Sequence, residues 1–179
     1  MTGNAYLKDC LLQLTKLKSQ ADRAVAQVDE RQFFASLDPE SNSIAVIMKH
    51  LAGNMRSRWS DFLTTDGEKP DRNRDAEFEP KVGETRASVL AEWERSWKLA
   101  LGTIGSLKAG DLERRVMIRG KPHTVLEAIN RQLTHYAAHV GQIILLAKHY
   151  AGSDWKTLSI PRGQSKQFEV SKDGKPYSL

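Results

Sequence analysis

Residues 124–150 read TVLEAINRQLTHYAAHVGQIILLAKHY, and this stretch is the longest helical pattern in the chain. Apolar side chains recur every three or four residues along it, which predicts one buried helix face. The positions of that face are Val125, Ile129, Leu133, Tyr136, Val140, Ile143, Ile144 and Ala147. His135 and His139 fall at its margin, and their i, i+4 spacing places two imidazoles on one side of the helix, roughly 5 to 6 Å apart at Cβ.

Three further segments show helical spacing of apolar residues. They cover residues 5–28, 43–64 and 85–107, each with polar side chains between the apolar ones. In the last segment the apolar positions alternate steps of three and four, which is typical of a seam between packed helices. Trp93 and Trp97 lie in that seam. Core packing is favoured for both over a role as a ligand platform.

The connections between these segments differ in character. Residues 65–84 form a long polar loop with Asp-Gly, Lys-Pro, Glu-Pro and Val-Gly pairs. Such a loop can travel the roughly 30 Å of a twenty-residue helix, so the helices it joins need not be antiparallel. Residues 115–120 alternate in polarity, which predicts a small hairpin or extended segment. After Gly152 the chain becomes polar and irregular.

Composition bounds the class of protein. A chain of 179 residues with 40% hydrophobic content is long enough to bury one sizeable core. The formal net charge is +5, but no basic arm and no aromatic-and-basic motif occurs, so nucleic-acid binding ranks last. Cys10 is the only cysteine, which excludes an intramolecular disulfide. We find no signal peptide and no membrane span in the sequence, and we expect a cytoplasmic protein without a membrane partner.

The histidine pair needs a third ligand to hold a metal, and His50 is the best candidate. Helical stepping places His50 at the edge of the apolar face of residues 43–64, near mid-helix. Facing helices of a bundle can bring such side chains together. His123 and His149 lie roughly 18 and 15 Å along the helix from the pair and cannot join the same site. Three neutral imidazoles leave a coordination position open, as in catalytic zinc sites.

Several motifs extend this pattern over nearly the whole chain. They are His50-Leu51-Ala52-Gly53-Asn54, Asp66-Gly67-Glu68-Lys69-Pro70, Arg72-Asn73-Arg74-Asp75, the run from His135 to Gln142, and Ile160-Pro161-Arg162-Gly163. In this order they resemble an uncharacterised branch of the DinB-like (YfiT-like) metalloenzyme superfamily.

The resemblance implies a fold and a cofactor. It implies an all-α four-helix bundle in the order up, down, down, up, with a long loop between helices two and three and an irregular C-terminal tail. We expect the domain over residues 1–165 and the tail over residues 166–179. The resemblance also implies that His50, His135 and His139 bind a divalent metal, nickel or zinc in the first place, with iron or manganese as alternatives.

The same resemblance implies a reaction class and partners. Characterised relatives include thiol transferases, so we expect a thiol S-transferase or hydrolase that acts on a small-molecule substrate such as a low-molecular-weight thiol. Family members often pair, so we expect a homodimer. The alternative is a metal-binding helical dimer without turnover, with a stress-related or structural role. No Asp or Glu stands at a position that marks it as a general base, so the catalytic residues stay unassigned.

Three further residues are candidates for orienting the ligands or binding substrate. Asn54 and Gln142 fall on the histidine side of their helices, although hydrogen bonding within the bundle explains both equally well. Arg162, together with Arg72 and Arg74, could bind an anionic group of a substrate. Solvated loop arginines are the commoner explanation for these three.

Overall fold

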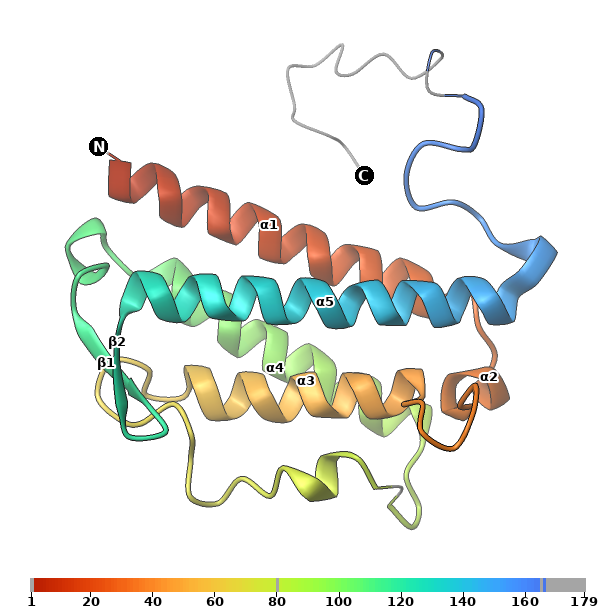
Figure 1. Ribbon diagram of the computed structural model, residues 1–179, viewed down its shortest axis with the longest axis horizontal. Coiled ribbons are helices and arrows are strands. Elements are labelled where there is room, and N and C mark those ends of the chain that lie inside the picture. The colour runs from red at the N-terminus through yellow and green to blue at the C-terminus, as the bar shows by residue number, and fades with distance from the viewer. Residues whose placement is uncertain (1, 80, 165, 167–179) are drawn as a thin grey trace.

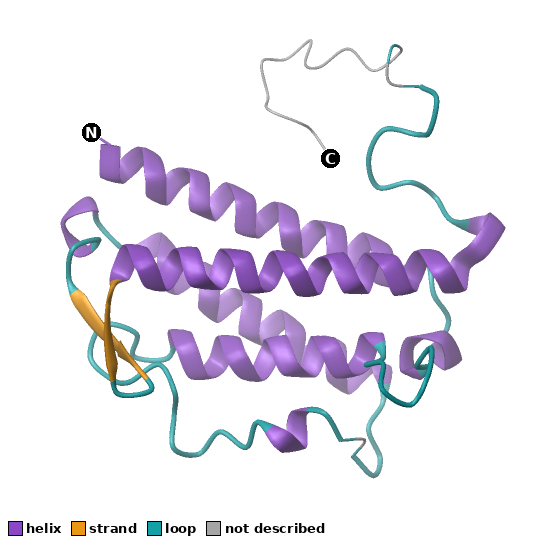
Figure 2. Ribbon diagram, in the orientation of Figure 1, coloured by secondary structure: helices purple, strands orange, loops and turns teal. Residues whose placement is uncertain are grey.

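The structure is a computed structural model that describes residues 2–79, 81–164 and 166. The chain is mostly helical and carries one small two-stranded antiparallel sheet (Figure 2). The all-α prediction is corrected by this sheet. The predicted tail, residues 166–179, lies outside the described residues except for residue 166. No helix in the described part of the chain is both long enough and apolar enough to cross a membrane.

Four long helices build most of the molecule (Figure 1). They are α1 (Thr2–Val25), α3 (Ile44–Trp59), α4 (Arg86–Ser106) and α5 (Val125–Ala151). Each of the last three begins directly after a hydroxyl residue whose side chain accepts a backbone N–H of the first turn. These caps are Ser43, Thr85 and Thr124. The predicted helix starts are therefore confirmed within one residue, except that α1 begins earlier than predicted.

The end of α3 differs from its prediction, which ran to Thr64. The helix stops at Trp59 because Ser60 turns to an extended conformation. Asp61 then adopts a φ of 47°, a left-handed conformation that Asp tolerates better than most residues. The chain leaves the helix at this point, and the apolar Phe62 is buried in the turn that follows.

Two small elements accompany the long helices. The short helix α2 (Glu30–Phe34) lies in the connection between α1 and α3, and Asp29 with Gln32 forms a capping box at its start. The strands β1 (Arg115–Ile118) and β2 (Lys121–Thr124) form an antiparallel hairpin, the first of the two alternatives predicted for residues 115–120, and its second strand lies beyond that predicted segment. Single 3-10 turns cover η1 (Asp75–Glu77), η2 (Ala109–Asp111) and η3 (Gly152–Asp154).

The core lies between the long helices, where α3 packs on α4 and on α5, and α1 packs on α4 and on α5. Trp93 and Trp97 are both buried in it, so the prediction of core packing is confirmed. Cys10 is also buried, and burial raises the pKa of its thiol, which suits an inert side chain.

The segment 60–85 decides what lies beside α3. It leaves the C-terminal end of α3 and returns along that helix to the place where α4 begins (Figure 1). Its turn η1 contacts α3. Near its end, Glu84 accepts a hydrogen bond of 2.9 Å from Lys49 in the second turn of α3. The loop therefore covers the face of α3 on which His50 stands, and it brings charged residues to that histidine.

Candidate metal centre

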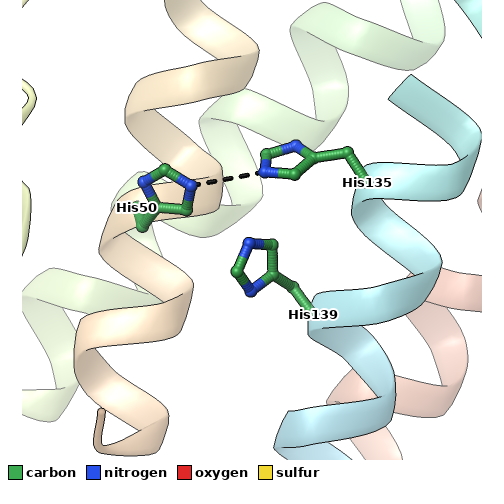
Figure 3. Close-up of side chains that lie close together, drawn as sticks. All are labelled: His50, His135 and His139. Carbon is green, nitrogen blue, oxygen red and sulfur yellow. Dashed lines mark hydrogen bonds between the residues drawn. The ribbon is translucent and has the colours of Figure 1, made fainter. Parts of the chain in front are cut away.

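Three histidines converge between α3 and α5. His50 comes from α3, and His135 and His139 come from successive turns of α5 (Figure 3). One ligating nitrogen from each lies within 4.8 Å of the other two. The Nε2 atoms of His50 and His135 are 3.4 Å apart. The three residues that were predicted from their spacing are therefore brought together in the fold.

The spacing of these nitrogens suits a cation. Zinc–nitrogen bonds of about 2.0 to 2.1 Å at tetrahedral angles separate two ligand nitrogens by roughly 3.3 Å. The distance between His50 and His135 matches this value. His123 and His149 lie outside the cluster, as predicted. The donor set of three imidazoles is one that zinc, nickel, copper and iron accept.

A carboxylate fixes the ring of His50. Its Nδ1–H donates to Oε2 of Glu77 over 2.9 Å, which leaves the Nε2 lone pair directed at the other histidines. Arg72 in turn donates to both carboxylate oxygens of Glu77, over 2.8 and 2.9 Å. Burial raises the pKa of Glu77, but the hydrogen bonds from His50 and Arg72 and the charge of Arg72 outweigh it and hold that pKa below its ordinary value. Glu77 is therefore ionised at neutral pH.

An amide performs the same task for His139. The Nδ1–H of His139 donates to Oε1 of Gln142 over 2.8 Å, one turn along α5. This assignment of the ring proton follows from the hydrogen-bond pattern. Gln142 thus lies where the sequence placed it, against a histidine ligand.

The other two predicted residues lie differently. Among the described residues no hydrogen bond joins Asn54 to the three histidines, and its Oδ1 accepts a hydrogen bond of 3.2 Å from the buried hydroxyl of Tyr136. It borders the cavity beside His50 and His135. Arg162 lies exposed in the segment after α5 and does not line that cavity.

Two of the three imidazoles, those of His135 and His139, are held in their neutral, metal-binding form. Burial lowers the pKa of His135 to about 4, and the neighbouring His139 and His50 act in the same direction. Burial also lowers the pKa of His139, against the opposing effect of its hydrogen bond to Gln142. Neutral nitrogens are therefore available at physiological pH without competition from protons.

Two hollows of similar size border α3. One, of about 460 Å³, is bordered by His50 and His135 and carries five arginines in its wall. The other, of about 480 Å³, lies toward the start of α4 and is bordered by none of the histidines. Of these two hollows, only the first borders the histidine cluster.

Comparison with known proteins places the chain in a family. The family described as "Protein of unknown function (DUF1572)" matches residues 1–164. The chain belongs to this family. No curated protein matches it. The match of the DUF1572 family covers α1 to α5 and therefore includes all three histidines, Glu77 and the arginines of the cavity wall.

Two participants were not predicted from the sequence. Glu77 gave no signal, because it lies 27 residues from His50 in an irregular loop and only the path of that loop brings them together. Arg72 was expected to be solvated, and this expectation is wrong, since its side chain is only 2% exposed. The motif around Arg72 was noticed, but its partner Glu77 was not.

Proposed function

We propose that the chain is a divalent-metal-dependent enzyme of the DinB-like superfamily, built as a four-helix bundle in the order up, down, down, up. The return of segment 60–85 along α3 supports this order, since it lets α3 and α4 begin at the same end. Under this proposal His50, His135 and His139 hold the metal, with nickel or zinc favoured.

One observation carries the proposal. Three imidazoles from two helices offer ligating nitrogens within 4.8 Å of one another, and two of the three rings are oriented by further hydrogen bonds. A shared cation fits both the 3.4 Å between the Nε2 atoms of His50 and His135 and the lowered pKa values of His135 and His139. The carboxylate of Glu77, backed by Arg72, raises the basicity of His50 as a ligand.

The chemistry follows from the number of ligands. A divalent cation held by His50, His135 and His139 would act as a Lewis acid and would lower the pKa of a bound water or thiol toward neutrality. The residues of the chain supply the orientation and the enclosure of this site. We therefore propose a thiol S-transferase or a hydrolase acting on a small molecule, with a low-molecular-weight thiol as a candidate partner.

The alternative is a metal-binding helical dimer without turnover. A structural metal site is closed by a fourth protein ligand. Among the described residues, the cluster contains three His, Cys, Asp or Glu side chains and no fourth. This donor set favours the enzyme over the structural role.

The metal is tested first. Protein purified without chelator should contain about one divalent metal per chain by elemental analysis, and His135→Ala and His139→Ala should reduce this content strongly. His149→Ala is the matched control, because His149 lies on the same helix outside the cluster. Unchanged metal content in His135→Ala and His139→Ala would show that these two histidines do not bind the metal.

The reaction is tested next. Thiol consumption with an electrophile such as a dinitrohalobenzene, across a panel of low-molecular-weight thiols, should require metal and His50. Hydrolysis of activated esters is the parallel assay for the hydrolase hypothesis. Equal rates in metal-free and metal-loaded protein would contradict both the transferase and the hydrolase hypothesis and would favour the non-catalytic dimer.

A further inference from the structure

The cavity beside His50 and His135 is lined by a set of cationic side chains. Its volume of about 460 Å³ falls in the range of small-molecule sites. The arginines in its wall are Arg58, Arg72, Arg74, Arg119 and Arg131. No Asp or Glu lines it among the described residues.

Nearby carboxylates do not balance this charge. Glu77 is occupied by Arg72, and Glu68 is shared by Arg58, Arg72 and Arg119 at 3.8, 3.5 and 3.2 Å. In the part of the chain that the structure describes, the guanidinium groups of Arg74 and Arg131 form no ion pair. These five guanidinium groups have Glu68 and Glu77 as ion-pair partners, and Asp66 also lies within electrostatic reach of Arg58, so the positive side chains outnumber the carboxylates around the cavity. A divalent cation on the three imidazoles would add two positive charges.

Buried polar atoms in the cavity wall also lack partners. Arg58 is only 3% exposed, yet its Nε and Nη1 atoms have no hydrogen-bond partner. Gln132 is 2% exposed, and its Oε1 atom is likewise unpaired. Unpaired buried donors of this kind are costly and rare, so the Arg58 guanidinium favours a ligand that accepts hydrogen bonds, whereas the Gln132 oxygen is itself an acceptor and does not pair with an anion.

We propose that this cavity binds an oxyanion of the substrate, a phosphate or carboxylate group, and that Arg58, Arg74 and Arg131 hold it beside the histidine site. The planar fork of arginine matches the geometry of such oxyanions. Arg72 is a positioning residue in this arrangement, because its Nε and Nη2 atoms already donate hydrogen bonds to Glu77. The inference rests on the proposed function in taking the histidine cluster as the reacting end of the site.

Binding of inorganic phosphate and of succinate to the metal-free protein tests the cavity directly. Isothermal titration of the wild-type chain should show binding of at least one of them, and the tighter of the two names the oxyanion. Arg131→Gln and Arg74→Gln should each weaken binding roughly tenfold, since each removes a charge-assisted contact. Both side chains are exposed at their outer ends, so both variants should fold.

Arg95→Gln is the matched control, because Arg95 is an exposed arginine of α4 that does not line the cavity. Its binding constant should equal that of the wild type. The proposal is overturned if neither anion binds, or if the double variant Arg74→Gln/Arg131→Gln binds as tightly as the wild type.

The same titrations separate this inference from the metal site. Wild-type protein that binds metal but neither anion overturns the cavity proposal alone. Protein that binds an anion in an Arg131-dependent way but binds no metal supports the cavity and overturns the proposed function alone. His139→Ala protein that has lost its metal and still binds the anion supports the cavity as a site in its own right.

Discussion

Tyr136 and His135 are neighbours on α5, yet one faces a closely packed aromatic core and the other faces a charged cavity. The Tyr136 hydroxyl is fully buried, accepts from Trp59 Nε1 over 2.9 Å and donates to Asn54 Oδ1 over 3.2 Å. The aromatic core around it is closely packed, and Trp97 lies edge-on to Tyr136 at 5.6 Å. One polar atom in this core, Trp97 Nε1, has no partner.

The region around His135 contains charges and unpaired polar atoms instead. Three of the four buried side-chain atoms without a partner in the described chain belong to Arg58 and Gln132, which line the cavity. The core region therefore stabilises the fold, whereas the cavity region holds unpaired polar groups at a cost to stability. Such a cost is characteristic of a site that a ligand completes.

The largest effect should come from the core. Trp97→Ala should lower the free energy of unfolding by about 3 to 5 kcal/mol, because it removes a fully buried ring and leaves a cavity. Metal content of the folded variant should stay unchanged. Chemical denaturation and elemental analysis measure the two quantities, and Leu145→Ala, at an exposed position of α5, is the control. A variant that folds normally but loses its metal would break the separation of the two regions.

The carboxylate behind His50 should come next. Glu77→Gln should weaken metal binding by about 10- to 100-fold, or roughly 1.4 to 2.7 kcal/mol, because the amide cannot replace the charge that orients and polarises His50. The stability of the metal-free protein should also fall, since Arg72 loses its main partner. Competition with a chelator measures the affinity, with the exposed Glu79→Gln as control. Equal affinity in both variants contradicts the role of Glu77.

A smaller effect of opposite sign is expected at Arg58. Arg58→Met should leave the free energy of unfolding unchanged or raise it by about 1 kcal/mol, because it replaces an incompletely paired buried charge by an apolar side chain. Anion binding in the cavity should weaken at the same time. Urea denaturation checks the first outcome. A loss of about 3 kcal/mol or more would instead make Arg58 a structural partner of Glu68.

The last expected effect concerns pH. Burial holds the pKa of His135 near 4 in the folded chain, below the ordinary value of about 6.5 that the unfolded chain retains. The unfolded state therefore takes up the proton first, and the contribution of His135 to stability is complete above pH 6.5 and is lost as the pH falls toward 4. Thermal melts of metal-free protein should show this decline, and His135→Gln should reduce it. Parallel curves for the two proteins would refute the assignment.

Much of the fold was predictable from the sequence because it depends on local interactions. The caps Ser43, Thr85 and Thr124 set the starts of three helices, and the hairpin followed from a period of two. The all-α prediction was incomplete only in that hairpin. The end of α3 was missed because the apolar Phe62 continued the helical pattern beyond the turn at Asp61.

The charged part of the site was not predictable in the same way. Arg58 stands in the last turn of α3, where a basic residue suits the helix dipole and gives no sign of burial. The segment after α3 buries it, since Gly67 packs against its guanidinium and donates its N–H to Met117 O of the hairpin over 2.8 Å. A side chain at Gly67 would collide with that guanidinium.

The sequence by itself determined that His135 and His139 share one face of one helix, because helical periodicity is set by neighbouring residues. It also singled out His50 as the third member. Only the tertiary structure decided that Glu77 and Arg72 stand behind His50 and that the cavity beside it is lined with arginines. These contacts depend on the return path of segment 60–85 along α3, and no local pattern encodes that path.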